Sequence, residues 1–125
     1  MKVLVDSSAW VAYFRGASAL PIIDWLIEEG LIVTNDLVLA ELLPALLLRG
    51  ERRLAGLLRD VERVPLTLDW NGIIEMQVTC LRHGINKVGI PDLIIAQHAR
   101  QNDLALLTLD KHFGLLSKYF PLNLQ

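Results

Sequence analysis

The apolar run Val3–Val5, which ends at Asp6, is the feature that most constrains how this chain can fold. A continuous apolar run without polar alternation is typical of a strand that is buried on both faces, as in the middle of a parallel sheet. Ser7 and Ser8 follow the acid as candidate caps of a helix. Ligands of open α/β sheets bind at the carboxyl ends of central strands. The sequence therefore places a carboxylate where such a fold forms its binding sites.

Strands alternate with helical segments along the rest of the chain. Further strands are predicted at 31–33, 64–66, 104–107 and 122–124, and helices at 8–15, 18–29, 37–49, 51–62, 69–83, 91–99 and 111–116. This alternation predicts a single domain over residues 1–125, a three-layer α/β/α sandwich around a parallel sheet of four to five strands.

Two prolines qualify this assignment. Pro65 indicates that the third strand lies at an edge of the sheet, because proline cannot donate to the ladder. Pro44 lies inside the helix predicted at 37–49. It is expected to kink or divide that helix, because an interior proline costs about 3 kcal/mol.

The composition favours an apolar surface that contacts a partner, and the overall charge does not by itself indicate nucleic-acid binding. Hydrophobic residues make up 53% of the 125 residues and the mean hydropathy is +0.40, which predicts apolar surface that contacts another molecule. The net charge is only −2, yet five arginines lie between Arg49 and Arg63. Arginine suits phosphate groups. Because acids such as Glu51, Asp60 and Glu62 are mixed in, the same run is also typical of a solvated helix face.

The compartment is indicated by cysteine usage and by the apolar runs. Cys80 is the single cysteine, which excludes an intramolecular disulfide and favours a reducing compartment. Asp6 interrupts the first apolar run, so no secretory signal is predicted. The longest apolar stretch, Leu37–Leu48, is much shorter than the ~20 residues that a bilayer requires. We expect a cytoplasmic protein without a membrane segment.

Four of the fourteen acidic residues occupy related places in the predicted fold. Asp6 and Asp110 follow the first and fourth strands, Glu41 is the one acid of an apolar helix after the second strand, and Asp92 lies in the first turn of another helix. Each alone is explained as a cap, a turn or a dipole partner. Because strand ends and helix starts meet at one edge of such a sheet, we expect the four together to form one site.

A cluster of carboxylates must either take up protons or hold a cation. Two carboxylates ~5 Å apart repel by about 3 kcal/mol at an effective dielectric of 20. Oxygen ligands favour Mg²⁺ or Mn²⁺ over zinc, and His83, His98 and His112 lack the spacing of a zinc site. All three histidines are interpreted as surface or structural residues, with His112 nearest to the site. A hard ion among carboxylates is suited to phosphodiester hydrolysis by metal-activated water.

With these positions in hand, the chain resembles the PIN domain and, more narrowly, the VapC-type toxin nucleases of bacterial and archaeal toxin–antitoxin pairs. Four blocks in family order carry the resemblance, namely Val3–Ser8, Leu39–Leu42, Ile90–Ala96 and Leu107–Phe113. The resemblance implies a sheet of order 3-2-1-4-5, in which the first and fourth strands place Asp6 beside Asp110.

The same resemblance implies a Mg²⁺- or Mn²⁺-dependent endoribonuclease that cleaves cellular RNA. Asp6, Glu41, Asp92 and Asp110 would be its catalytic residues, with Asp6, Asp92 and Asp110 as metal ligands. Ser8 and Thr108 match hydroxyl positions that often support this site, and both are equally explained as plain caps.

Two residues depart from the family pattern. Pro44 follows Glu41 by three residues, where a continuous helix is usual. His112 stands where the family often carries a further Asp or Glu, which predicts one bound metal ion rather than two.

The resemblance also implies partners. VapC-type toxins form homodimers and are neutralised by a VapB-like antitoxin peptide laid along a hydrophobic groove. The stretch Leu37–Leu48, with Leu54, Leu57 and Leu58, would supply this groove or would simply form core helices. The candidates for contacts with the RNA backbone or with antitoxin acids are Arg49, Arg52, Arg53 and Lys87.

A second interpretation is a catalytically inactive PIN-like adaptor that only binds partners. A receiver or a phosphatase on a similar sheet is disfavoured, because position 8 is a serine and no second acid adjoins Asp6.

Overall fold

The structure is a computed structural model, and it describes residues 1–16 and 21–125. Five parallel strands form one sheet in the order β3-β2-β1-β4-β5, which confirms the predicted fold class and strand order. The strands are β1 (Val3–Val5), β2 (Ile32–Thr34), β3 (Glu62–Arg63), β4 (Ala105–Leu107) and β5 (Asn123–Leu124). The helices are α1 (Ser7–Phe14), α2 (Pro21–Glu28), α3 (Asp36–Leu48), α4 (Arg52–Asp60), α5 (Trp70–Arg82), α6 (Ile90–Gln101) and α7 (Lys111–Leu116). The start predicted for the second helix, at residue 18, lies outside the described residues.

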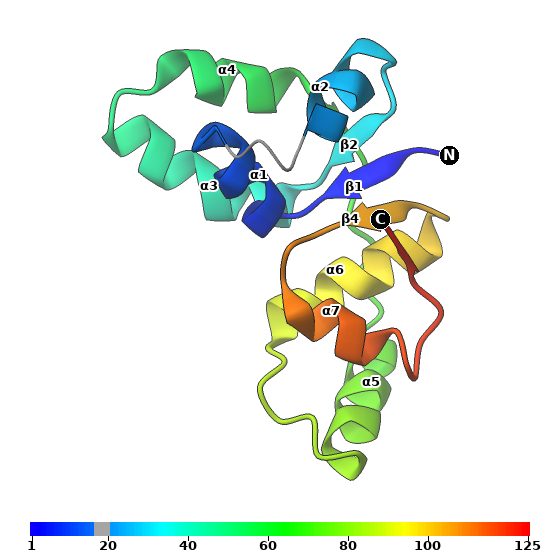
Figure 1. The fold of residues 1–125 in the computed structure, drawn as a ribbon. Coiled ribbons are helices and arrows are strands. Elements are labelled where there is room, and N and C mark those ends of the chain that lie inside the picture. The colour runs from blue at the N-terminus through cyan, green and yellow to red at the C-terminus, as the bar shows by residue number, and fades with distance from the viewer. Residues whose placement is uncertain (17–20) are drawn as a thin grey trace.

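The sheet is covered on both faces. Helices α1 to α4 lie above the strands in Figure 1, and α5 to α7 lie below them. This arrangement follows from right-handed crossovers, because the chain moves in one direction along the sheet from β1 to β3 and returns in the other direction to β4 and β5. All three residues of β1 are buried, as the unbroken apolar run predicted.

The third strand lies two residues earlier than predicted. It pairs Glu62 with Val33 and Arg63 with Thr34, and Val64 N–H still donates to the carbonyl of Thr34 at 2.9 Å. Pro65 has no N–H with which to continue the ladder, so the strand ends before it. The predicted edge position is confirmed.

Helix α3 is not divided at Pro44, contrary to that part of the prediction. The Asn35 side chain begins the helix by accepting a hydrogen bond from Val38 N–H at 2.9 Å. Proline removes the bond that position 44 would donate to the carbonyl of Ala40. Ala40 and Pro44 are both exposed, so water can satisfy that carbonyl and the helix continues to Leu48.

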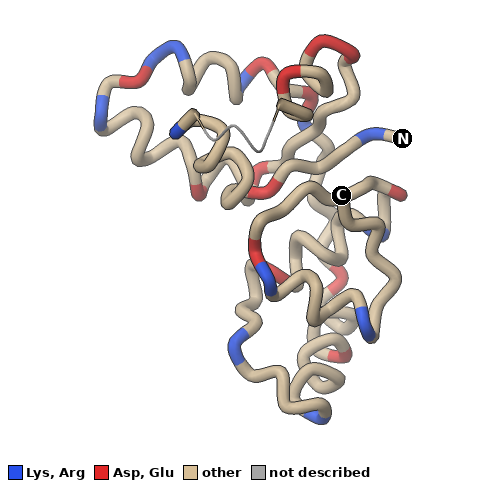
Figure 2. Tube along the Cα trace, in the orientation of Figure 1, with Lys and Arg blue, Asp and Glu red and all other residues tan. Residues whose placement is uncertain are grey.

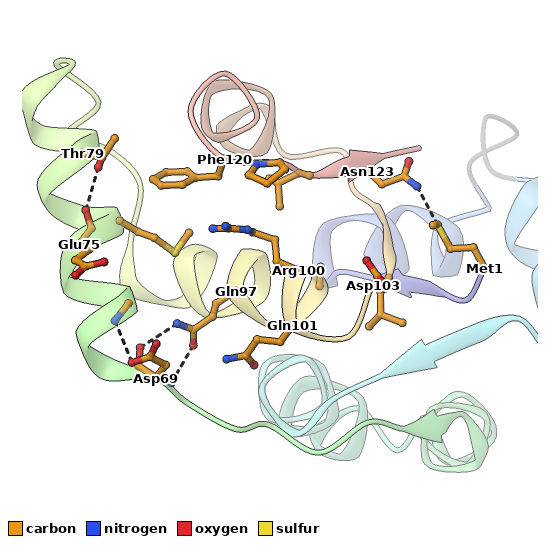
Figure 3. A pocket seen from close by; sticks show the side chains of 16 residues that line it. Met1, Asp69, Glu75, Thr79, Gln97, Arg100, Gln101, Asp103, Phe120 and Asn123 are labelled. Atoms are coloured by element: carbon orange, nitrogen blue, oxygen red, sulfur yellow. Dashed lines mark hydrogen bonds between the residues drawn. The ribbon is translucent and has the colours of Figure 1, made fainter.

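Two buried polar side chains of α6 hold this helix against its neighbours. Gln97 donates from Nε2 to the carbonyl of Asp69 at 2.9 Å and accepts from the N–H of Asp69 at 3.1 Å, which fixes the start of α5 (Figure 3). His98 is buried, and its Nδ1 lies 3.1 Å from the amide nitrogen of Asn35, the cap of α3. Burial is the main cause that lowers the pKa of His98, so the imidazole is neutral and Nδ1 accepts this bond. The bond between His98 and Asn35 fixes α6, which carries Asp92, relative to α3, which carries Glu41.

No helix among the described residues has the length and apolar character needed to cross a membrane.

Candidate metal centre

Asp6 is fixed at the carboxyl end of β1 by three hydrogen bonds. It is buried, and its Oδ1 accepts from Ala9 N–H at 3.0 Å, as the N-cap of α1, and from the Ser8 hydroxyl at 2.7 Å. Its Oδ2 accepts from the Thr108 hydroxyl. Ser8 and Thr108, the two predicted supporting residues, therefore hold the orientation of the Asp6 carboxylate.

The same two hydroxyls position the segment that follows β4. Ser8 Oγ accepts from Leu109 N–H at 3.0 Å, and Thr108 Oγ1 accepts from Asp110 N–H at 2.9 Å. Val5 and Leu107 are register partners in β1 and β4, so Asp6 and Asp110 follow neighbouring strands, as predicted. Asp110 in turn caps α7, because its Oδ1 accepts from His112 N–H at 2.9 Å.

Asp92 reaches this centre from the first turn of α6. Its Oδ2 accepts from the N–H of Gly89, the N-cap residue of α6, at 3.4 Å. Burial and then the charge of Asp110 raise the pKa of the Asp92 carboxyl, and the hydrogen bond from Gly89 and the neighbouring His112 oppose this rise only in part. Burial and the neighbouring Asp110 therefore disfavour the ionised form of the Asp92 carboxyl when no cation is bound.

Glu41 lies near the same acids. Partial burial of its carboxyl raises its pKa, and the charges of Asp92 and then Asp6 raise it further. The residue as a whole remains exposed, so water still reaches part of the side chain. The continuous helix through Pro44 thus leaves Glu41 within electrostatic reach of Asp92 and Asp6.

His112 completes the tightest group of possible ligand atoms in the described part of the chain. One atom each of Asp92, Asp110 and His112 lies within 4.8 Å of the other two. His112 Nδ1 is 3.2 Å from Asp110 Oδ1 and 3.5 Å from Asp92 Oδ2. Sequence reasoning placed His112 near the site but gave it no role. Its position two residues after Asp110, in the first turn of α7, was the available signal.

The group fits a divalent cation. His112 Nδ1 is buried and makes no hydrogen bond, although the carboxylates of Asp92 and Asp110 lie next to it. Adjacent ligands of an octahedral ion lie about 3 Å apart when each is about 2.1 Å from the ion, and the observed separations of 3.2 and 3.5 Å are close to this value. Asp6 and Glu41 lie outside this tight group and flank it.

The acids come from both helical layers. Figure 2 shows acidic segments of both layers near the left ends of the strands, where α1, α6 and α7 begin. Acidic residues therefore gather at this edge, with Lys111 as a basic neighbour directly after Asp110.

The predicted basic contacts are exposed and do not join this group. Arg49, Arg52 and Arg53 lie where α3 passes to α4, at the far left of Figure 2, and Lys87 lies in the loop before α6. Only Arg49 of these residues lines a small cavity of about 240 Å³ that Glu41 also lines.

A larger cavity, of about 880 Å³, lies between α5, α6 and the C-terminal segment (Figure 3). Its central cation is Arg100, whose guanidinium lies 5.7 Å from the centre of the Phe120 ring, and Asp69, Glu75 and Asp103 lie on its walls. None of the predicted site residues lines it. The candidate site is therefore identified by the ligand atoms of Asp92, Asp110 and His112, which lie close together, and not by the size of a cavity.

Comparison with known proteins agrees with this architecture. The sequence model of the family described as "PIN domain" matches residues 3–118. The comparison with curated proteins returns no match.

Several solved structures share the fold. A chain of the DNA-bound VapBC complex from Salmonella typhimurium superimposes with a TM-score of 0.75 at 17% identity, covering 100% of this chain and 97% of that one. A chain of VapBC-1 from nontypeable Haemophilus influenzae gives 0.71 at 20% identity, with 100% and 97% covered. A sarcin–ricin loop cleaving VapC toxin from Mycobacterium tuberculosis gives 0.62 at 18% identity, with 91% and 94% covered. The family match spans nearly the whole sequence, and the protein therefore belongs to the PIN-domain family.

Proposed function

We propose that this protein is a VapC-type toxin, a divalent-metal-dependent endoribonuclease that cleaves cellular RNA. The observation that carries the proposal is the convergence of Asp92, Asp110 and His112 within 4.8 Å, with Glu41 and Asp6 beside them, at the strand ends of a PIN domain. The solved structures with this fold include VapBC complexes and a toxin that cleaves the sarcin–ricin loop, which supports the same assignment.

The residues have distinct roles in this proposal. Asp92 and Asp110, with Asp6 as a third carboxylate, would hold Mg²⁺ or Mn²⁺, which when bound activates water and neutralises charge on the phosphate. Glu41 has a raised pKa, so it can accept a proton from water closer to neutral pH than an ordinary glutamate can. Ser8 and Thr108 keep the Asp6 carboxylate in one orientation through their hydrogen bonds.

The test is RNA cleavage by the purified, antitoxin-free protein. We expect structured RNA to be cut in Mn²⁺ or Mg²⁺ and to stay intact in EDTA. Glu41→Gln should lower the rate by about 10²–10⁴-fold, the usual loss when a general base is removed. Asp36→Asn is the matched control, because Asp36 is an exposed acid at the start of the same helix and pairs with Arg63. Intact RNA with the unmodified protein in both metals would refute the proposal.

The adaptor interpretation makes a different prediction. An inactive PIN-like adaptor folds and binds its partners without cleaving RNA. Expression in a host cell separates the two, since a ribonuclease toxin arrests growth and an adaptor does not. Growth arrest that Glu41→Gln abolishes, at equal protein level, supports the enzyme.

We place the antitoxin contact at the small cavity between α1, α3 and α4. Its apolar lining combines Leu42, Ala45, Leu46 and Leu54, from the stretches that the sequence indicated, with Val11 and Phe14 of α1. Leu58, also predicted for this groove, is instead fully buried in the core. Arg49 and Glu41 add charge at the rim for a peptide with ionised side chains.

A pair of variants on α3 tests this contact. Ala45→Arg fills the cavity, so it should abolish binding of a VapB-like antitoxin peptide. Leu48→Arg is the control, because Leu48 is 90% exposed on the same helix and does not line the cavity. Equal binding by both variants, measured by calorimetry, would place the peptide elsewhere.

We also propose a homodimer formed through α5. Trp70, Ile74, Val78 and Leu81 follow one face of this helix and are all exposed, Ile74 by 60%. In an antiparallel pair this stripe is self-complementary, as a two-fold interface requires, because Trp70 meets Leu81 and Ile74 meets Val78. Ile74→Glu should give a monomer in sedimentation equilibrium, with Leu48→Arg as control. A dimer of unchanged affinity in Ile74→Glu would exclude this face.

The proposed substrate and the buried thiol of Cys80 both fit the cytoplasm, where RNA is present and thiols stay reduced.

A further inference from the structure

The ring of His112 makes no hydrogen bond of good geometry among the described residues. Its backbone N–H donates to Asp110, but its ring nitrogen Nδ1 is buried without a hydrogen bond. A buried polar atom left unpaired costs about 1–3 kcal/mol. A ring nitrogen kept in such a place, 3.2 Å from one carboxylate oxygen and 3.5 Å from another, suggests that something else satisfies it.

We propose that His112 is a nitrogen ligand of the metal ion, and that the centre therefore prefers a first-row transition-metal ion such as Mn²⁺ or Co²⁺ over Mg²⁺. The inference rests on the proposed function, in that it concerns the metal of the same site. It differs from the oxygen-only ligand set that the sequence implied, because the histidine stands where an acid is common in the family.

The ligand chemistry gives the order of preference. Mg²⁺ favours oxygen ligands and retains several waters, so an imidazole adds little to its binding. Affinity of a site with nitrogen ligands rises from Mn²⁺ to Co²⁺ along the transition series. Asp92 and Asp110, with Asp6 as the third carboxylate, supply anionic oxygens, and His112 supplies a neutral nitrogen. We therefore expect Co²⁺ to bind most tightly, then Mn²⁺, then Mg²⁺.

A competing explanation uses the same contacts. An imidazolium at His112 could itself offset the charge of Asp92 and Asp110 without any metal contact. The 3.5 Å separation from Asp92 is long for a hydrogen bond, and the contact with Asp110 lacks hydrogen-bond geometry, so neither contact fully satisfies Nδ1. A measurement that detects the nitrogen itself distinguishes the two.

Calorimetric titration of the metal-free full chain measures the preference. We expect the unmodified protein to bind Co²⁺ at least about tenfold more tightly than Mg²⁺, since even indirect ligand partners change metal affinity by about 10–100-fold. His112→Gln should lower Co²⁺ and Mn²⁺ affinity by about tenfold or more and leave Mg²⁺ affinity within about threefold. His112→Asp should raise Mg²⁺ affinity. His83→Gln, at an exposed histidine after α5, is the control.

Pulsed electron paramagnetic resonance of bound Mn²⁺ detects a directly coordinated nitrogen. We expect a ¹⁴N coupling in the unmodified protein and in His83→Gln, and none in His112→Gln or His112→Asp. Absence of the coupling in the unmodified protein, or its persistence in both His112 variants, would overturn the proposal. If His112→Gln fails to fold by circular dichroism, His112→Asp and the unmodified spectrum still decide.

The two proposals fail separately. RNA that is cut while Mn²⁺ shows no nitrogen coupling excludes His112 as a ligand and leaves the nuclease intact. Nitrogen coupling in a protein that cuts no RNA excludes the nuclease and leaves the metal centre intact.

Discussion

Replacing Asp92 by asparagine should stabilise the metal-free protein while removing its activity. Asparagine keeps an oxygen that can accept from Gly89 N–H, so the start of α6 is preserved. It removes a negative charge from a place where burial and Asp110 already raise the pKa of the carboxyl. The negative charge of Asp92, which would bind the proposed metal, therefore lowers the stability of the folded protein when no metal is bound.

The size of the effect follows from the geometry. The ligand oxygens of Asp92 and Asp110 lie within 4.8 Å of each other. At this separation two charges repel by about 3.5 kcal/mol at an effective dielectric of 20 and by about 1 kcal/mol in bulk water. The two side chains are 24% and 32% exposed, which places the interaction between these limits. After screening we expect Asp92→Asn to gain about 1–2 kcal/mol in free energy of unfolding, or about 4–8 °C in melting temperature.

Urea unfolding in EDTA at low salt measures this gain. Asp69→Asn is the control, since Asp69 also begins a helix by accepting from Gly72 N–H but lies outside the acidic group. Its stability should change by less than about 0.5 kcal/mol. The gain of Asp92→Asn should shrink in 1 M salt, because screening weakens the repulsion. A loss of stability in Asp92→Asn would show that the carboxylate serves chiefly as a helix cap, and equal stability would refute the repulsion.

Two further predictions concern pH and packing. Glu41 and Asp92 have raised pKa values in the folded protein, so the folded state takes up protons more readily than the unfolded state. The stability that this proton uptake contributes is lost as the pH rises through the folded pKa values. The metal-free protein should therefore gain stability as the pH falls from 7 toward 4.5. Denaturant titrations across this range check the slope, which should flatten in Asp92→Asn; a slope of the opposite sign in the unmodified protein would contradict the reasoning. Gly72→Ala should destabilise by about 1 kcal/mol, because overpacking costs about 1–3 kcal/mol and the helical preference for alanine returns about 1 kcal/mol; its Cβ would lie 2.9 Å from both Asp69 Oδ2 and Gln97 Nε2. Gly56→Ala in α4, where a Cβ meets nothing within 4 Å, should stabilise instead, and thermal unfolding of the pair tests the difference.

Much of the architecture could be predicted because it depends on local patterns. The unbroken run Val3–Val5 is explained by a strand covered on both faces, and the rule that ligands bind at strand ends predicted that Asp6 and Asp110 lie at the same edge of the sheet. The order of the strands came from the family resemblance, which the structure confirms.

The misses depend on information that a linear pattern lacks. Pro44 cannot donate a hydrogen bond to the carbonyl of Ala40. Whether the helix is divided there depends on whether water can reach that carbonyl. The bounds of β3 depend on its register with β2, which pairs Glu62 with Val33. The proposed role of His112 depends on the direction of its ring, whose Nδ1 lies 3.2 Å from Asp110 Oδ1, and no spacing in the sequence encodes that direction.

The helix caps at the candidate metal centre have a consequence for the order of folding and metal binding. Asp6, Asp92 and Asp110 each accept backbone N–H groups at the start of a helix. The first turn of a helix carries about half a positive elementary charge, so the fold surrounds its acids with partial positive charge before any ion arrives. We therefore expect the chain to fold without metal and to load it afterwards, unlike zinc fingers, whose folding requires the ion. The ion would then bind to a site that is already formed, and the free energy of unfolding would rise with metal concentration by mass action.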